Sequence, residues 1–198
     1  VNTYVGLFSP LACLALHEGL YRWLLDTNTK DKDVLRTGLL TSFITVAGFD
    51  IIAWIFLKII NYSYRSEFIL LVTAAAFYTI AQFITRGLRN NKIYAVQGII
   101  YSLALILCNL ALVIWLRLQA RGLLLSMAIA YIVTIVFMVA VQHLARDYVI
   151  PGNVDKDLAE DLIKYSLPIV PNNIAWWFVS ASNRIVINWG MGDAANGI

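Results

Sequence analysis

The chain has 198 residues, of which 60% are hydrophobic and 14% charged, and its formal net charge is +3. A soluble domain carries about a quarter charged residues, so lipid must be the solvent for much of this apolar surface. The basic residues are spread along the chain and do not cluster with aromatic residues, which argues against a nucleic-acid partner.

Charged residues separate the apolar stretches, so membrane spans can be counted between them in chain order. The predicted spans are Val1 to about Leu16, Thr37 to Leu57, and the stretches between Glu67 and Arg86, Lys92 and Arg117, Arg121 and His143, and Lys164 and Trp189. Most of them approach the ~20 residues that a helix needs to cross the hydrocarbon core. Their near-continuous apolar character, without alternation, excludes a barrel. We therefore predict an all-α, polytopic membrane helical bundle with about six transmembrane helices.

Lysine and arginine are divided unevenly between the two sets of connections. The richer set holds Arg22, Lys30, Lys32, Arg36, Arg86, Arg89, Lys92, Arg146, Lys156 and Lys164, and the poorer set holds Lys58, Arg65, Arg117 and Arg121. The positive-inside rule places the richer set in the cytoplasm, and Val1 then lies at the outer face. A chain without a signal rarely starts there, so we expect a helix upstream and count these helices as two to seven of a longer protein.

The longest connection runs from His143 to Lys164 and contains Pro151-Gly152-Asn153. Asn153 or Asp155 is suited to cap a short helix there. The apolar side of that helix would carry Leu158, Leu162 and Ile163. A long cytoplasmic connection at this point indicates a joint between two bundles.

A polar stripe follows the last predicted span. Its members are Asn173, Trp177, Ser180, Arg184 and Asn188, whose spacings of 4, 3, 4 and 4 place them on one helical face. A cation in a membrane helix is expected to face protein or a water-filled cavity, and the planar fork of arginine suits a phosphate. The alternative is that Arg184 extends to the outer lipid headgroups beside Trp189.

Two prolines stand near the start of the same span, at Pro168 and Pro171. Proline removes backbone hydrogen bonds and bends a helix, so the pair predicts a hinge. The alternative is an ordinary helix start, where proline is tolerated.

Other polar residues lie inside or next to spans. Asp50 is a candidate for a proton or cation site, or for an ion pair with another helix. His17 and Glu18 are expected at the cytoplasmic end of their span, where an interfacial position competes with a substrate or coupling role. Gln82, Gln97 and Asn109 are expected to make interhelical hydrogen bonds.

Enzymatic signatures are missing from the sequence, which contains no GxSxG, HExxH, GxGxxG or Walker A pattern. With two histidines, and with Cys13 and Cys108 isolated in apolar runs, we expect neither a metal site nor a cofactor. The sequence predicts a protein that is not an enzyme.

The segment DLIKYSLPIVPNNIAWWFVSASNRIVINWGMGDAANGI, from Asp161 to Ile198, resembles the seventh helix of bacterial polysaccharide and O-antigen flippases. These proteins belong to the multidrug/oligosaccharidyl-lipid/polysaccharide exporter superfamily. The matching elements are KYSLPIVPN, the pair Trp176-Trp177, ASNR, and the closing glycine and Ala-Asn-Gly-Ile. LALHEGLYRWLLD (Leu14–Asp26) and ITRGLRNNKIYAVQGI (Ile84–Ile99) are similar to the family more loosely.

The resemblance implies a two-lobe transporter of 12–14 helices in the bacterial inner, or plasma, membrane. Residues 1–143 would then form the rest of the N-terminal lobe, 144–163 a cytoplasmic connector, and 164–198 the first helix of the C-terminal lobe. It also implies a cargo, an undecaprenyl-diphosphate-linked oligosaccharide moved to the outer leaflet by alternating access. The partners would be this cargo, membrane lipids and the polysaccharide polymerase machinery. Arg184 would contact the diphosphate, with Asn173, Trp177, Ser180 and Asn188 along the same wall.

Three other functions remain open on the sequence, one of them a non-transporting scaffold. A multidrug or organic-cation antiporter of the same superfamily would need an acidic cavity, which Asp50 favours and Arg184 opposes. A membrane polysaccharide polymerase or ligase would need a large outer loop, and the connections Lys58–Glu67 and Arg117–Arg121 are short.

Overall fold

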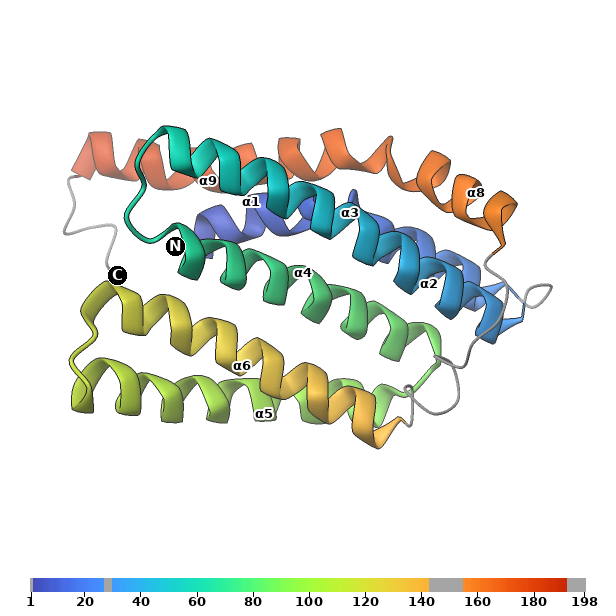
Figure 1. The fold of residues 1–198 in the computed structure, drawn as a ribbon, viewed down its shortest axis with the longest axis horizontal. Helices are drawn as coiled ribbons and strands as arrows, with labels where there is room; N and C mark the ends of the chain where they lie inside the picture. The colour runs from blue at the N-terminus through green and yellow to red at the C-terminus, as the bar shows by residue number, and fades with distance from the viewer. Residues whose placement is uncertain (1, 27–29, 143–154, 192–198) are drawn as a thin grey trace.

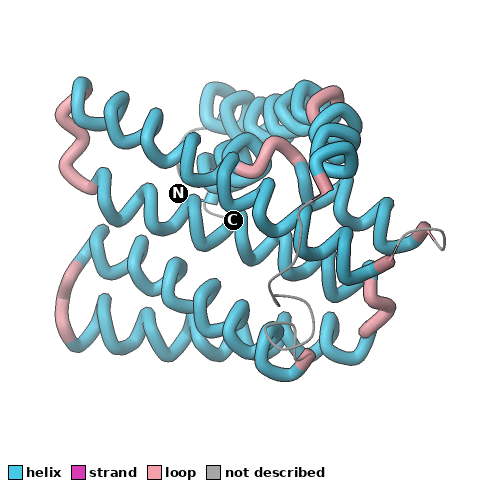
Figure 2. Tube along the Cα trace, turned by 45° about the vertical axis from the view of Figure 1, so that its right-hand side comes forward, coloured by secondary structure: helices cyan, strands magenta, loops and turns pink. Residues whose placement is uncertain are grey.

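The helices of the chain run back and forth along one long axis in the computed structural model (Figure 1). The structure describes residues 2–26, 30–142 and 155–191, with side chains from residue 3 to residue 182 within those ranges. Every regular element in these ranges is helical, and short loops join most of them (Figure 2). The predicted all-α helical bundle is confirmed.

Four helices in the described ranges are long and apolar enough to cross a membrane. They are α3 (Asp31–Ile59), α4 (Arg65–Gly87), α5 (Asn91–Asn109) with its π-helical continuation η1 (Leu110–Trp115), and α6 (Gln119–Val141). They correspond to the second to fifth predicted spans. The chain is therefore a membrane protein with four such helices in its described part.

The first predicted span is broken, so the expectation of one helix ending near Leu16 is wrong. Helix α1 (Asn2–Ala12) ends soon after Pro10, and α2 (Leu16–Leu25) continues in the same general direction (Figure 1). Between them Leu14 and Ala15 take left-handed φ angles of 47° and 54°. Proline cannot donate a backbone hydrogen bond, and the left-handed turn closes the helix with a bond from Ala15 N to Pro10 O at 2.9 Å.

The last predicted span begins in the final turn of α8 (Lys156–Ser166) and continues, after an interruption at Leu167 and Pro168, as α9 (Ile169–Met191). The predicted short helix begins where expected, because the Asp155 carboxylate accepts hydrogen bonds from the backbone N–H groups of Asp157 and Leu158 at 3.0 and 3.2 Å. On its exposed face Lys164 Nζ lies 2.7 Å from Glu160 Oε1. The hydrogen bond from Lys164 lowers the pKa of the Glu160 carboxyl. Helix α8 passes through Lys164 without interruption.

Helix α4 is the centre of the bundle. On one side Val72, Ala76, Ile80 and Ile84 pack with residues of α1, α2 and α3. On the other side Leu71, Ala74 and Ala75 pack against Leu124, Met127 and Ala128 of α6. The alanines allow close approach of neighbouring helices, which is how membrane helices associate when lipid is as apolar as their side chains.

Lipid-facing surface is concentrated on α3 and α5. None of the most apolar window of α5 and η1 is buried, and its large exposed residues include Ile99, Leu103, Ile106 and Leu107. In water such a surface would drive association, whereas in a bilayer the acyl chains cover it.

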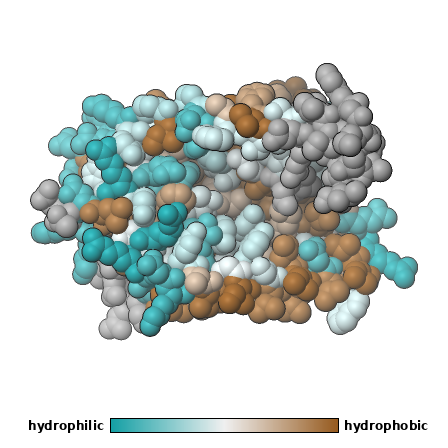
Figure 3. All heavy atoms as spheres, turned by 180° about the vertical axis from the view of Figure 1, so that it is seen from behind, coloured by the Kyte–Doolittle hydropathy of each residue, from teal (hydrophilic) through white to brown (hydrophobic). Residues whose placement is uncertain are grey.

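The two ends of the bundle differ in polarity. The α2–α3 and α4–α5 connections lie at one end, and the α3–α4 and α5–α6 connections lie at the other (Figure 1). Hydrophilic residues gather at the first end, as the view from behind shows (Figure 3). This is the end that carries the lysine- and arginine-rich connections predicted to face the cytoplasm.

Candidate functional site

The two broken helices lie side by side in opposite directions. Helix α1 packs against α9, and α2 packs against α8, so the first helix of each pair meets the second helix of the other (Figure 1). A close contact lies at Gly19 of α2, where an added Cβ would be 2.6 Å from Ser166 Oγ and 3.3 Å from a methyl group of Leu162. Gly19 is the fourth residue of α2 and Ser166 is the last residue of α8, so the first turn of α2 packs against the last turn of α8.

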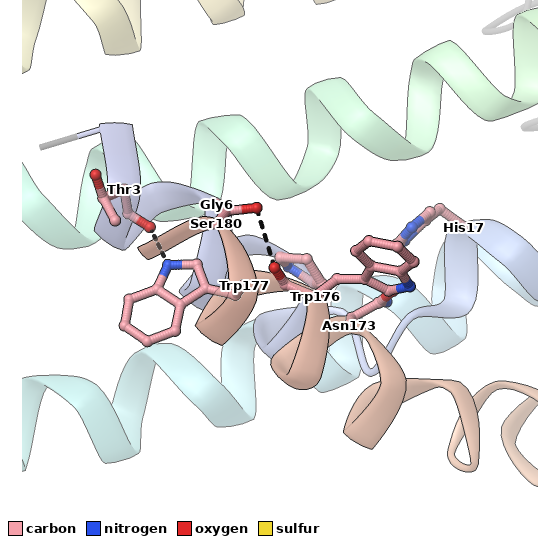
Figure 4. Close-up of a pocket in the computed structure, with 8 residues that line it drawn as sticks. Thr3, Gly6, His17, Asn173, Trp176, Trp177 and Ser180 are labelled. Carbon is pink, nitrogen blue, oxygen red and sulfur yellow. Dashed lines mark hydrogen bonds between the residues drawn. The ribbon is translucent and has the colours of Figure 1, made fainter. Parts of the chain in front are cut away.

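A cavity of about 410 Å³ opens beside these breaks. Figure 4 shows that side chains of α9 form one wall, with α1 and the start of α2 opposite. Its lining residues are Thr3, Gly6, Pro10, His17, Asn173, Trp176, Trp177 and Ser180. The helical stripe thus brings Asn173, Trp177 and Ser180 together on one wall, as their spacing predicted.

Trp177 connects the two walls. Its indole N–H donates to the Thr3 carbonyl at 2.5 Å, joining α9 to α1 (Figure 4). Ser180 Oγ donates to the Trp176 carbonyl within α9 at 3.0 Å, so its lone pairs remain available as acceptors. The wall therefore combines two indole rings with amide and hydroxyl groups, and the described lining residues include no carboxylate or guanidinium. Such a wall suits an uncharged, hydrogen-bonding ligand part.

His17 is the second residue of α2, just after the break, and it is only 5% exposed. Its ring packs edge-on against Phe83 with 4.7 Å between centroids, and Nδ1 lies 3.4 Å from Cys13 Sγ. Phe83 also lies under the Arg86 guanidinium, near the end of α4, so the expected interfacial position of His17 and its role toward substrate both stay predictions.

Arg184 and Asn188 belong to the backbone of α9, but their side chains lie outside the described residues. The predicted phosphate contact of Arg184 and the wall position of Asn188 therefore stay predictions.

The two prolines of the last span differ in their positions. Pro168 stands in the break between α8 and α9, where a bend was predicted. Pro171 is the third residue of α9, in the first turn, where a missing N–H costs little because no intrahelical acceptor is available. The helix is thus interrupted at Pro168, where the hinge stays a prediction, and Pro171 stands at an ordinary helix start.

Asp50 is away from this cavity. Both of its carboxylate oxygens accept from Thr73 Oγ1 of α4, at 2.9 and 2.8 Å, and the same hydroxyl lies 2.9 Å from the Ile69 carbonyl. The partner from a neighbouring helix is a hydroxyl, not the cation that the ion-pair alternative required. This geometry favours a structural contact between α3 and α4.

We expect Asp50→Asn to keep the contact to Thr73, since the amide oxygen still accepts a hydrogen bond. The unfolding midpoint in detergent should stay close to that of the wild type. Asp50→Leu should lower stability by about 1 kcal/mol, the usual value of an interhelical hydrogen bond in membranes. A midpoint that falls as far in Asp50→Asn as in Asp50→Leu would contradict the hydrogen-bond role and point to a need for the charge.

The three amide side chains predicted to bond between helices have three different outcomes. Asn109 Oδ1 accepts from Ser126 Oγ of α6 at 2.7 Å, which confirms the prediction. Gln82 donates to the Tyr78 hydroxyl one turn away on its own helix, so an interhelical bond is wrong for it. Gln97 is buried, and its Oε1 has no hydrogen-bond partner among the described residues.

Sequence reasoning missed the α1 side of the cavity, namely Thr3, Gly6 and Pro10. Pro10 was the available signal, because a proline inside an apolar run predicts a break a few residues later. The same proline removes the N–H that would bond the Gly6 carbonyl in a regular helix.

Fold and site together define a membrane helical bundle with paired broken helices and a polar, aromatic cavity between them. No protein-family model, curated protein or solved structure matches the chain.

Proposed function

We propose that the chain is part of a membrane transporter that moves an amphiphilic, lipid-linked cargo across the bilayer. The observation that carries this proposal is the cavity between the two broken helices. Irregular backbone at membrane depth is tolerated only where it is buried in protein or lines a water-filled cavity. Interrupted helices that pack against each other around a cavity are typical of secondary transporters, where they form the substrate site.

The chemistry of the cavity supports a cargo with a hydroxyl-rich part. Asn173 and Ser180 offer hydrogen-bonding groups, and Trp176 and Trp177 offer flat apolar faces. Stacking of aromatic rings combined with hydrogen bonds is the usual means of holding a sugar. The sequence stripe continues to Arg184 and Asn188, so an anionic group attached to that sugar would meet a guanidinium further along α9.

With the resemblance of Asp161–Ile198 to polysaccharide flippases, the cargo we propose is an undecaprenyl-diphosphate-linked oligosaccharide. The protein would carry it from the cytoplasmic to the outer leaflet of a bacterial inner membrane by alternating access. The breaks at Leu14–Ala15 and Leu167–Pro168 would supply the bending points. Export of surface polysaccharide would depend on this step and on the polymerase that follows it.

The organic-cation antiporter has less support. Its main sequence argument was Asp50, which bonds to Thr73 and does not line the cavity. The described lining residues carry no carboxylate that would attract a cation.

The test is a flipping assay with the complete protein reconstituted into liposomes. A fluorescent undecaprenyl-diphosphate oligosaccharide is added to both leaflets, and a membrane-impermeant quencher is applied outside. Protein-containing vesicles should lose the protected half of the signal over time, whereas protein-free vesicles should retain it. A protected fraction that persists with correctly folded protein would contradict the proposal. Uptake of tetraphenylphosphonium by the same vesicles would favour the antiporter.

A further inference from the structure

A second cavity lies against a neighbouring face of α1. Its volume is about 310 Å³, and it is lined by residues of α1, α4, α5 and α6, among them Ser9, Thr79 and three tyrosines. The described residues that line it include no charged side chain. None of its tyrosines was singled out by the sequence pattern, because Tyr78, Tyr101 and Tyr131 belong to three different helices.

The three tyrosines form one aromatic cluster. The Tyr101 and Tyr131 rings are stacked with centroids 4.9 Å apart and an interplanar angle of 20°. Tyr78 lies 5.5 Å from the first and 4.9 Å from the second. All three are only partly buried and line the cavity. Gln82 Nε2 donates to the Tyr78 hydroxyl oxygen at 2.8 Å, which leaves the hydroxyl hydrogen free to be donated elsewhere.

Gly6 links this cavity with the one described above, because it lines both. A Cβ built at Gly6 would meet no atom within 4 Å, so the space beside it is open. Pro10 removes the usual helical donor to the Gly6 carbonyl, which places a backbone acceptor at this junction. Both cavities combine aromatic rings with uncharged hydrogen-bonding groups.

We propose that the tyrosine cavity is a carbohydrate subsite, in which a neutral sugar unit packs on the Tyr78–Tyr101–Tyr131 cluster after passing Gly6. The inference rests on the proposed function, because the carbohydrate is the polar part of the proposed cargo. A neutral sugar fits this lining, since it presents hydroxyl groups to Ser9 and Thr79 and C–H groups to aromatic rings. A charged group would be desolvated there without a partner.

The test measures sugar binding apart from transport. The complete protein is purified in a detergent without a sugar headgroup and titrated with maltotetraose, chitotetraose and a galactose tetramer in saturation-transfer NMR. At least one neutral tetramer should receive saturation from the wild type. Tyr101→Ala should weaken its affinity by about 3- to 10-fold, the value of one aromatic contact, whereas Tyr101→Phe should keep most of it.

Gly6 supplies the second arm, with Gly98 as its matched control. Both positions have open space for a side chain, but Gly98 lies on α5 and lines neither cavity. Gly6→Leu should therefore fold and lose binding by about tenfold or more, as a filled site does, whereas Gly98→Leu should bind as the wild type. Equal effects at the two glycines, or unchanged affinity in Tyr101→Ala, would overturn the subsite.

The outcomes separate the two proposals. If no tetramer binds the wild type while the lipid-linked cargo is flipped, the subsite is wrong and the transporter stands. If a tetramer binds with the expected variant pattern but no cargo is flipped, the transport proposal is wrong and the binding site stands.

Discussion

Replacing Trp177 by alanine is expected to slow flipping of the lipid-linked oligosaccharide by about tenfold or more, which corresponds to roughly 1.4 kcal/mol. The substitution removes the hydrogen bond from the indole N–H to the Thr3 carbonyl, and with it a direct link between α9 and α1. It also removes an aromatic wall of the cavity. The measurement is the initial rate of quencher accessibility in liposomes at matched protein density.

Two further variants show which property of Trp177 matters. Trp177→Phe keeps a ring and loses the N–H, so an intermediate rate would separate the hydrogen bond from the aromatic surface. Trp115→Ala makes the same chemical change on η1. The Trp115 side chain is 83% exposed and is not among the residues that line the cavity. An equal loss of transport in Trp115→Ala and Trp177→Ala would mean that the effect is not specific to the cavity.

Gly19→Ala is expected to destabilise the protein by about 1–3 kcal/mol, as overpacking of a tight contact does. The added Cβ would lie 2.6 Å from Ser166 Oγ and 3.5 Å from the Leu162 backbone oxygen. Ser166 and Leu162 are both fully buried, so neither side chain has free space to move into. The thermal unfolding midpoint of the purified protein in detergent, followed by tryptophan fluorescence, measures this effect.

A double-mutant cycle tests whether Ser166 causes the clash. Ser166 Oγ is buried with no hydrogen-bond partner among the described residues, so Ser166→Ala alone should change stability by less than about 1 kcal/mol. In the double variant the closest atom is gone, and most of the loss should be recovered. Gly98→Ala, at a site with open space, should not lower stability. Additive effects of the Gly19 and Ser166 substitutions would show that the two residues do not touch.

The four unbroken spans could be predicted from sequence because each is a continuous apolar stretch bounded by charges. The number of residues in such a stretch shows whether a helix is long enough to cross the membrane. The short helix α8 was also predictable, since the Asp155 cap and the apolar side of Leu158 and Leu162 are local features. The first span was mispredicted because the hydropathy of a stretch does not reflect the helix-breaking effect of Pro10. The left-handed turn at Leu14 and Ala15 has no glycine to mark it.

One wall of the candidate site could also be predicted from the sequence, and the other could not. The shared wall of Asn173, Trp177 and Ser180 followed from helical spacing, which is a property of one helix. The opposite wall could not be found, because Thr3 and Trp177 are 174 residues apart and only packing joins them. Asp50 stood out as a charge in a span, but its partner Thr73 has no distinguishing mark in the sequence.

The sequence by itself determined that this is an all-α membrane protein. Backbone polar groups in lipid must be hydrogen-bonded within the protein, which only helices and closed barrels achieve, and long continuous apolar stretches select the helix. Its uneven lysines and arginines also determined an expected orientation. Only the tertiary structure decided that two broken helices pack against each other, and that three tyrosines from separate helices meet. Contacts of that kind depend on how side chains of distant segments fit together, such as Gly19 against Ser166. The hydropathy pattern along the sequence carries no information about that fit.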